Sequence, residues 1–105
     1  MNALLNQYRS TIASACRKYG VQRLAVFGSA AREDFDVASS DFDFVVRFND
    51  TRTPGYADRY LDLAESLEGS LGRPVDLITE RSIRNPILHQ QIAKDSIVLY
   101  EDRDS

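Results

Sequence analysis

Acidic residues in this sequence are spaced in a way that suits a divalent cation. Asp41 and Asp43 form an Asp-x-Asp pair directly before a run of strand-forming residues, and Asp76 lies inside a second apolar run. Residues i and i+2 of a strand share one face, roughly 6.5 Å apart along the chain, so the first two carboxylates can converge on one ion. Mg²⁺ prefers oxygen ligands and is commonly held by one or two carboxylates together with substrate phosphates. The pattern would therefore suit a site for a divalent cation such as Mg²⁺.

The Asp-x-Asp pair is weak evidence when taken alone. Eleven of the 105 residues are aspartates, and the pattern occurs three times, at 34/36, 41/43 and 102/104. Only the pair at 41/43 leads straight into a strand, although both residues could simply be solvated there, and Asp76 could be a polar residue of an edge strand. If the strand of Asp76 lies beside that of Asp43, three carboxylates meet at one edge and their mutual repulsion calls for a cation.

The dipeptide Gly28-Ser29 follows a predicted strand and could bind an anion. Glycine lets the backbone approach a ligand closely, and the free N–H groups at the start of a helix attract negative charge. The same two residues would also suit an ordinary strand-to-helix turn with Ser29 as the N-cap. The order of strand, Gly-Ser, loop, Asp-x-Asp strand, helix and Asp-bearing strand is a more specific signal than any of its parts.

Hydrophobic periodicity predicts the elements that position these residues. The predicted strands are 21–27, 42–48, 74–78 and 96–100, and the predicted helices are 3–19, 53–71 and 85–94. A Thr53-Pro54 pair and an Asn85-Pro86 pair indicate two of the helix starts. Strands alternating with helices predict an α/β (α+β) fold, a small mixed sheet of about four strands covered by helices, in a single domain at 1–105.

Several side chains are assigned to the core by the same spacing. Phe42, Phe44, Val46 and Phe48 should share one face of their strand. Cys16 falls on the apolar stripe of the first helix, and the long helix is predicted to bury four residues of its own. Those four residues are Tyr60, Leu61, Leu67 and Leu71.

Composition excludes several kinds of function. Thirteen Lys and Arg against sixteen Asp and Glu give a net charge of −3, which argues against a protein that binds duplex DNA by neutralising phosphates. One cysteine and one histidine argue against a cysteine-based zinc site and a Ser-His-Asp triad. No apolar run reaches the ~18 residues of a membrane span, and the first residues lack the apolar core of a signal peptide, so we expect a cytoplasmic protein. Catalysis would then rely on carboxylates, hydroxyls and bound ions.

The segment AVFGSAAREDFDVASSDFDFVVRF resembles the signature of the minimal nucleotidyltransferases of the DNA polymerase β superfamily. The matching residues are Gly28, Ser29, Ala31, Arg32, Ser40, Asp41, Asp43 and Asp76. The last segment, RNPILHQQIAKDSIVLY, also looks like the C-terminal helix and strand of this family. The chain is most similar to the small MNT proteins, the antitoxin partners of HEPN-domain toxins. It departs from the pattern at Glu33, where the family usually has glycine, and in a slightly longer loop before Asp41.

The resemblance implies the nucleotidyltransferase fold and a two-metal site. Asp41 and Asp43 would hold two Mg²⁺ ions on the triphosphate of ATP. Asp76 would share one of these metals and help to deprotonate the acceptor hydroxyl. The metals would stabilise both the attacking and the leaving oxygen at the α-phosphate.

The resemblance also implies a phosphate site and a protein substrate. Gly28 and Ser29 would contact the terminal phosphates, and Arg32 could reach a phosphate as well. The acceptor in the antitoxin members is a tyrosine hydroxyl of the cognate HEPN ribonuclease, and transfer of AMP to it would block that toxin. Duplex nucleic acid and membranes are not expected as partners.

Alternatives and weaker assignments remain beside this interpretation. The chain could be a non-catalytic module of the same fold that neutralises a partner by direct binding. A Ca²⁺ loop around residues 34–41 lacks the turn glycine and closing glutamate of an EF-hand, and a sugar-nucleotide transferase would need a longer chain. Arg47 shares the strand face of Asp43 and could pair with the aspartates or reach a phosphate, and His89 is predicted to be a surface or packing residue.

Overall fold

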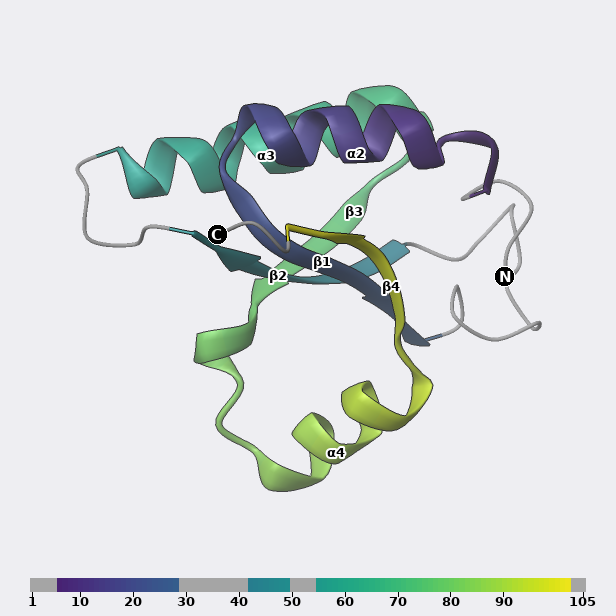
Figure 1. The fold of residues 1–105 in the computed structure, drawn as a ribbon. Coiled ribbons are helices and arrows are strands. Elements are labelled where there is room, and N and C mark those ends of the chain that lie inside the picture. The colour runs from purple at the N-terminus through teal and green to yellow at the C-terminus, as the bar shows by residue number, and fades with distance from the viewer. Residues whose placement is uncertain (1–5, 29–41, 50–54, 103–105) are drawn as a thin grey trace.

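The computed structural model describes residues 6–28, 42–49 and 55–102. The elements are α2 (Arg9–Lys18), β1 (Val21–Phe27), β2 (Phe42–Phe48), α3 (Tyr56–Leu71), β3 (Val75–Thr79), the short 3₁₀ helix η2 (Glu80–Ser82), α4 (Pro86–Asp95) and β4 (Ile97–Glu101). Figure 1 shows a sheet between two helical layers. The predicted α/β fold with a mixed sheet of four strands is confirmed.

The four strands form one sheet in the order β3-β2-β1-β4. β1 runs antiparallel to both β2 and β4, whereas β2 and β3 are parallel. The C-terminal end of β1 and the N-terminal ends of β2, β3 and β4 therefore lie at the same end of the sheet. Three of the predicted site residues, Gly28, Asp43 and Asp76, lie at this end.

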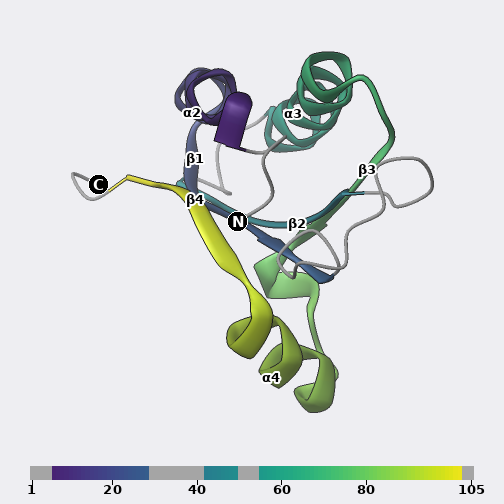
Figure 2. The ribbon, with the colours of Figure 1, turned by 90° about the vertical axis from the view of Figure 1, so that its right-hand side faces the viewer.

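Helices α2 and α3 lie side by side on one face of the sheet, and α4 lies on the other (Figure 2). The main core fills the first interface. It includes the inward residues of β2, which are Phe42, Phe44, Val46 and Phe48 as predicted, together with Cys16. The opposite face holds a smaller cluster of Ala25, Val45 and Ile92, so α4 covers this face with few buried residues.

Helix α3 departs from the sequence prediction at its start and on its buried face. It begins at Tyr56 with Gly55 as the N-cap, and not at a Thr53 cap. Its buried stripe contains Leu63 at 0% exposure, whereas Leu61, predicted to be core, is 59% exposed. Two residues turn a helix by about 200°, so Leu61 points away from the sheet while Leu63 points into it.

The start of α4 and the end of α3 agree better with the capping residues of the sequence. The Asn85 side chain accepts hydrogen bonds from the N–H groups of Ile87 and Leu88 at the start of α4, with Pro86 in the first turn. Gly72 ends α3 with a φ of 69°, while Gly69 lies inside the helix. No helix within the described ranges is long and apolar enough to cross a membrane.

Candidate active site

Two of the three predicted metal ligands face each other at one end of the sheet. Asp43 is the second residue of β2 and Asp76 the second residue of β3, and they are direct cross-strand partners. Neighbouring strands lie about 4.8 Å apart and directly opposed residues share a face, so both carboxylates project from the same side of the sheet. The condition set by the sequence, that the strand of Asp76 lies beside that of Asp43, is therefore met.

Gly28 completes this end from the other side of β2. Phe27, the last residue of β1, is the cross-strand partner of Asp43, and Gly28 follows it with a φ of 72°. A Cβ atom at Gly28 would lie 2.8 Å from Oδ2 of Asp43, which is closer than non-bonded atoms approach. The positive φ favours glycine here, and a side chain at this position would force the flexible carboxylate of Asp43 to move.

The donor set of this edge fits a hard divalent cation. Two adjacent carboxylates repel each other unless positive charge lies between them, and carboxylate oxygens are the ligands of Mg²⁺. Asp43 is half-buried and Asp76 is exposed, so a cation bound here could reach substrate phosphates. Within the described part of the chain no group of three His, Cys, Asp or Glu residues converges. The third predicted ligand, Asp41, lies outside the described residues, as do Ser29 and Arg32.

Arg47 lies on the same face of β2 as Asp43 but interacts elsewhere. Its Nη1 atom lies 3.6 Å from Oε1 of Glu80, in the short helix that follows β3. Both side chains are substantially exposed, so the pair contributes little to stability. The structure therefore places Arg47 beside Glu80 and gives no support to a pair with the aspartates.

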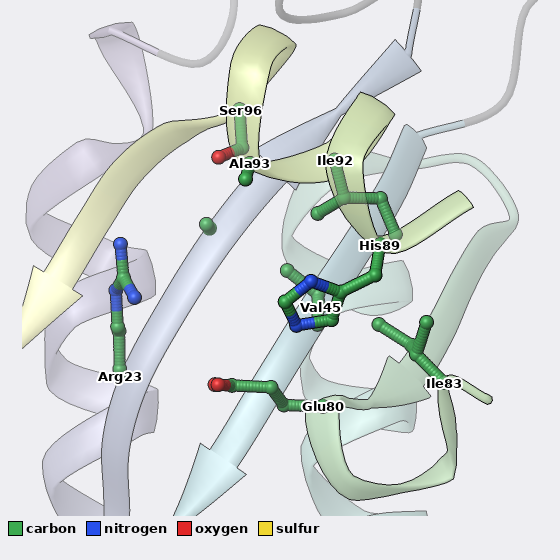
Figure 3. Close-up of a pocket in the computed structure, with 9 residues that line it drawn as sticks. Arg23, Val45, Glu80, Ile83, His89, Ile92, Ala93 and Ser96 are labelled. Atoms are coloured by element: carbon green, nitrogen blue, oxygen red, sulfur yellow. The ribbon is translucent and has the colours of Figure 1, made fainter. Parts of the chain in front are cut away.

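A pocket of about 150 Å³ lies on this same face, between the sheet and α4. Figure 3 shows the ends of Arg23, Glu80 and His89 around it, with Val45 from the sheet beneath them. Val45 is two residues from Asp43 along β2 and shares its face of the sheet. His89 is exposed, which confirms its prediction as a surface residue.

Two residues of α3 contact the strand of Asp76 in a way that the sequence did not reveal. The hydroxyl of Tyr60 donates to the carbonyl oxygen of Leu77, and the carboxylate of Glu68 accepts from the N–H of Val75. The sequence predicted Tyr60 only as a core residue. Nothing in the sequence distinguishes Glu68 from other exposed acidic residues of a helix. Both contacts depend on the position of β3 relative to α3, and the local sequence does not indicate that position.

Comparison with known proteins places this geometry in a family. The family model "Polymerase beta, Nucleotidyltransferase" matches residues 10–105. The chain belongs to this nucleotidyltransferase family. The predicted resemblance is therefore confirmed, and the protein is an enzyme of the nucleotidyltransferase class.

Individual relatives and solved structures are also similar to this chain. "Putative protein adenylyltransferase MJ1379" of Methanocaldococcus jannaschii is 44% identical over 80 residues, which cover 76% of this chain and 78% of that protein. A structure described as a "putative minimal nucleotidyltransferase" superposes with a TM-score of 0.75 at 35% identity, covering 92% of this chain and 95% of that one.

Two further similar structures are toxin–antitoxin complexes. A chain of a toxin–antitoxin crystal structure with AMP-PNP gives a TM-score of 0.69 at 26% identity, covering 90% of this chain and 74% of that one. A chain from the structure of the complex between the tri-AMPylated Shewanella oneidensis HEPN toxin and MNT antitoxin gives a TM-score of 0.64 at 24% identity, covering 93% of this chain and 73% of that one. At that identity the second likeness concerns the fold alone.

Proposed function

We propose that this protein transfers AMP from ATP to a tyrosine hydroxyl of a cognate HEPN ribonuclease toxin and thereby acts as its antitoxin. The observation that carries the proposal is the opposed pair of Asp43 and Asp76 beside Gly28, in a chain of the polymerase β nucleotidyltransferase family. A protein that neutralised its partner by contact alone would have no need for two mutually repelling carboxylates at this edge.

The cation site would be formed by Asp41, Asp43 and Asp76, and Mg²⁺ is the expected metal, with two ions bound. When bound, Mg²⁺ would offset the charge of the triphosphate and of the oxygens that react at the α-phosphorus. Gly28 supports a close approach of phosphate, because glycine has no side chain to stand between its backbone and a ligand. Ser29 and Arg32 are proposed to hold the terminal phosphates.

The reaction is a single displacement at phosphorus. The tyrosine oxygen forms a bond to the α-phosphorus, the bond from that phosphorus to the bridging α–β oxygen breaks, and pyrophosphate leaves. Asp76 is exposed and can receive the proton of the hydroxyl. Positioning and electrostatics supply most of the catalysis in phosphoryl and nucleotidyl transfer, which agrees with a chain that has one histidine and one cysteine.

The proposed partner rests on the likeness to a toxin–antitoxin structure. Within the described ranges the side chain of Asp76 is exposed, which leaves it accessible to the hydroxyl of a partner. We therefore propose that residues 1–105 act as a single catalytic domain, in the cytoplasm, where the partner protein completes the acceptor side.

A direct test is co-expression with the product of the neighbouring gene, with Asp43→Asn as the variant. We expect the wild type to relieve growth arrest caused by that product and to leave an AMP mass on one of its tyrosines. Asp43→Asn should bind the same partner but neither modify nor neutralise it. Undiminished neutralisation by Asp43→Asn would reject the catalytic proposal and favour inhibition by direct binding.

A further inference from the structure

The strand that carries Asp76 lies at the edge of the sheet. β3 hydrogen-bonds to β2 on one side, and the sheet order gives it no strand neighbour on the other. Edge strands are the parts of a sheet that separate most easily, because half of their backbone groups have no ladder partner. The spacing between Asp43 and Asp76 therefore depends on what holds the outer edge of β3.

Two side chains of α3 occupy that outer edge. The hydroxyl of Tyr60 donates to the carbonyl oxygen of Leu77, and the N–H of Val75 donates to Oε2 of Glu68 at 3.2 Å. Alternate residues of a strand direct their backbone groups to the same side, so these two bonds bracket Asp76 from the edge opposite to β2. Figure 2 shows α3 above the part of the sheet that β2 and β3 form.

We propose that Tyr60 and Glu68 are positioning residues that hold Asp76 at the distance from Asp43 that a divalent cation requires. This proposal rests on the proposed function, because it takes Asp43 and Asp76 as cation ligands. Mg²⁺ and Mn²⁺ accept small errors in ligand position poorly, so a strand free to shift would lose affinity before it lost its fold. Leu77 is buried against α3, which keeps β3 in the sheet even when one of the two bonds is removed.

The variants are chosen to remove one bond at a time. Tyr60→Phe keeps the ring and deletes only the hydroxyl, and Tyr100→Phe makes the same change on β4, at the opposite edge of the sheet. Glu68→Ala deletes the acceptor, Glu68→Gln restores an acceptor oxygen, and Glu65→Ala removes another exposed acid of the same helix.

The measurement is Mn²⁺ affinity by electron paramagnetic resonance in the presence of ATP, with amide hydrogen exchange of residues 75–79 recorded on the same samples. We expect Tyr60→Phe and Glu68→Ala each to weaken Mn²⁺ binding about tenfold, the scale of losses when a ligand's supporting bond is removed. Exchange in β3 should become faster in both. Glu68→Gln should recover most of the affinity, and Tyr100→Phe and Glu65→Ala should match the wild type.

The outcomes separate this proposal from the one it rests on. If the wild type binds no Mn²⁺, or Asp76→Asn binds it as tightly as the wild type, the proposed cation site fails and this inference fails with it. If Asp76→Asn loses affinity while Tyr60→Phe and Glu68→Ala keep it, the cation site stands and the positioning role is wrong. Unfolding curves for each variant identify any loss of affinity that comes from loss of the fold.

Discussion

Asp43 and Asp76 oppose each other across two strands but differ in their surroundings. Asp43 is half-buried beside Gly28, whereas Asp76 is exposed on an edge strand. Like charges in direct cross-strand positions destabilise a sheet. At the scale of single residues, we therefore expect the two carboxylates to lower the free energy of unfolding without a cation, and cation binding to raise it.

Asp76→Asn tests whether repulsion between the two carboxylates lowers stability and whether a cation removes that effect. Without a divalent cation, the variant should melt at the same temperature as the wild type or slightly higher, because one of two repelling charges is gone. Addition of Mg²⁺ and ATP should raise the melting temperature of the wild type but not that of the variant. Differential scanning fluorimetry measures both, with Asp62→Asn on exposed α3 as the control. A variant that is less stable in the absence of the cation would contradict the assignment of repulsion at this edge.

Gly28→Ala tests the requirement for glycine beside Asp43. An alanine at a φ of 72° costs about 1 kcal/mol of folding stability, and its methyl group would displace the carboxylate that now lies 2.8 Å from the Cβ position. We expect a small loss in the free energy of unfolding and a much larger loss of nucleotidyl transfer. Gly69→Ala is the matched control, because that glycine is helical and its Cβ would meet nothing within 4 Å. The control should raise stability by up to about 1 kcal/mol. Equal activity in the two variants would refute the role of Gly28.

At the scale of elements, the strands were predicted closely because their signals are local. β1 and β2 have the predicted bounds, since a run of apolar residues ends at Gly28 in one case and an alternating pattern begins at the aspartates in the other. The parallel pairing of β2 with β3 was posed only as a condition, because pairing of distant segments leaves no local pattern. The same limit explains why the contacts of Tyr60 and Glu68 were missed. Ser29, Arg32 and Asp41 stay predictions, because they lie outside the described residues.

The buried face of α3 gives a prediction with its control on the same helix. Leu63 is fully buried in the main core, and Leu63→Ala should lower the free energy of unfolding by about 2–5 kcal/mol through loss of burial and a residual cavity. Leu61 is 59% exposed, so Leu61→Ala should change it by less than about 0.5 kcal/mol. Urea unfolding monitored by circular dichroism compares the two. A larger effect at Leu61 would mean that α3 is rotated from the orientation described.

At the scale of the whole molecule, the two faces of the sheet differ in how much apolar surface they bury. The core between the sheet and α2 and α3 is large and apolar, whereas the face of Asp43 carries the smaller cluster and the pocket beneath α4. Substitutions of buried residues in the first layer should therefore mainly lower stability, and substitutions on the second face should mainly lower nucleotidyl transfer, apart from the α3 residues Tyr60 and Glu68 that contact β3. Cys16 lies in the first layer, so the pH dependence of unfolding reports on the burial of its thiol.

Burial raises the pKa of the Cys16 thiol from 9.0 to about 12, partly offset by Arg17. The folded chain keeps the proton in a range where the unfolded chain loses it, so the stability due to Cys16 is complete below about pH 9 and falls as the pH rises toward 12. Between neutral pH and about pH 10.5, the wild type should lose about 2 kcal/mol more than Cys16→Ala, which has no thiol. Urea unfolding at both pH values measures the difference. Parallel pH dependence of the two proteins would show that the thiol is accessible to water in the folded state.

The central claim is nucleotidyl transfer at the edge formed by Asp43 and Asp76, and label transfer tests it most directly. The purified protein is incubated with Mg²⁺, the product of its neighbouring gene, and ATP labelled at either the α- or the γ-phosphate. We predict that the α-label becomes bound to the partner and the γ-label is released with pyrophosphate, and that Asp43→Asn and Asp76→Asn transfer neither. Transfer of the γ-label, or undiminished transfer of the α-label by both variants, would contradict the account.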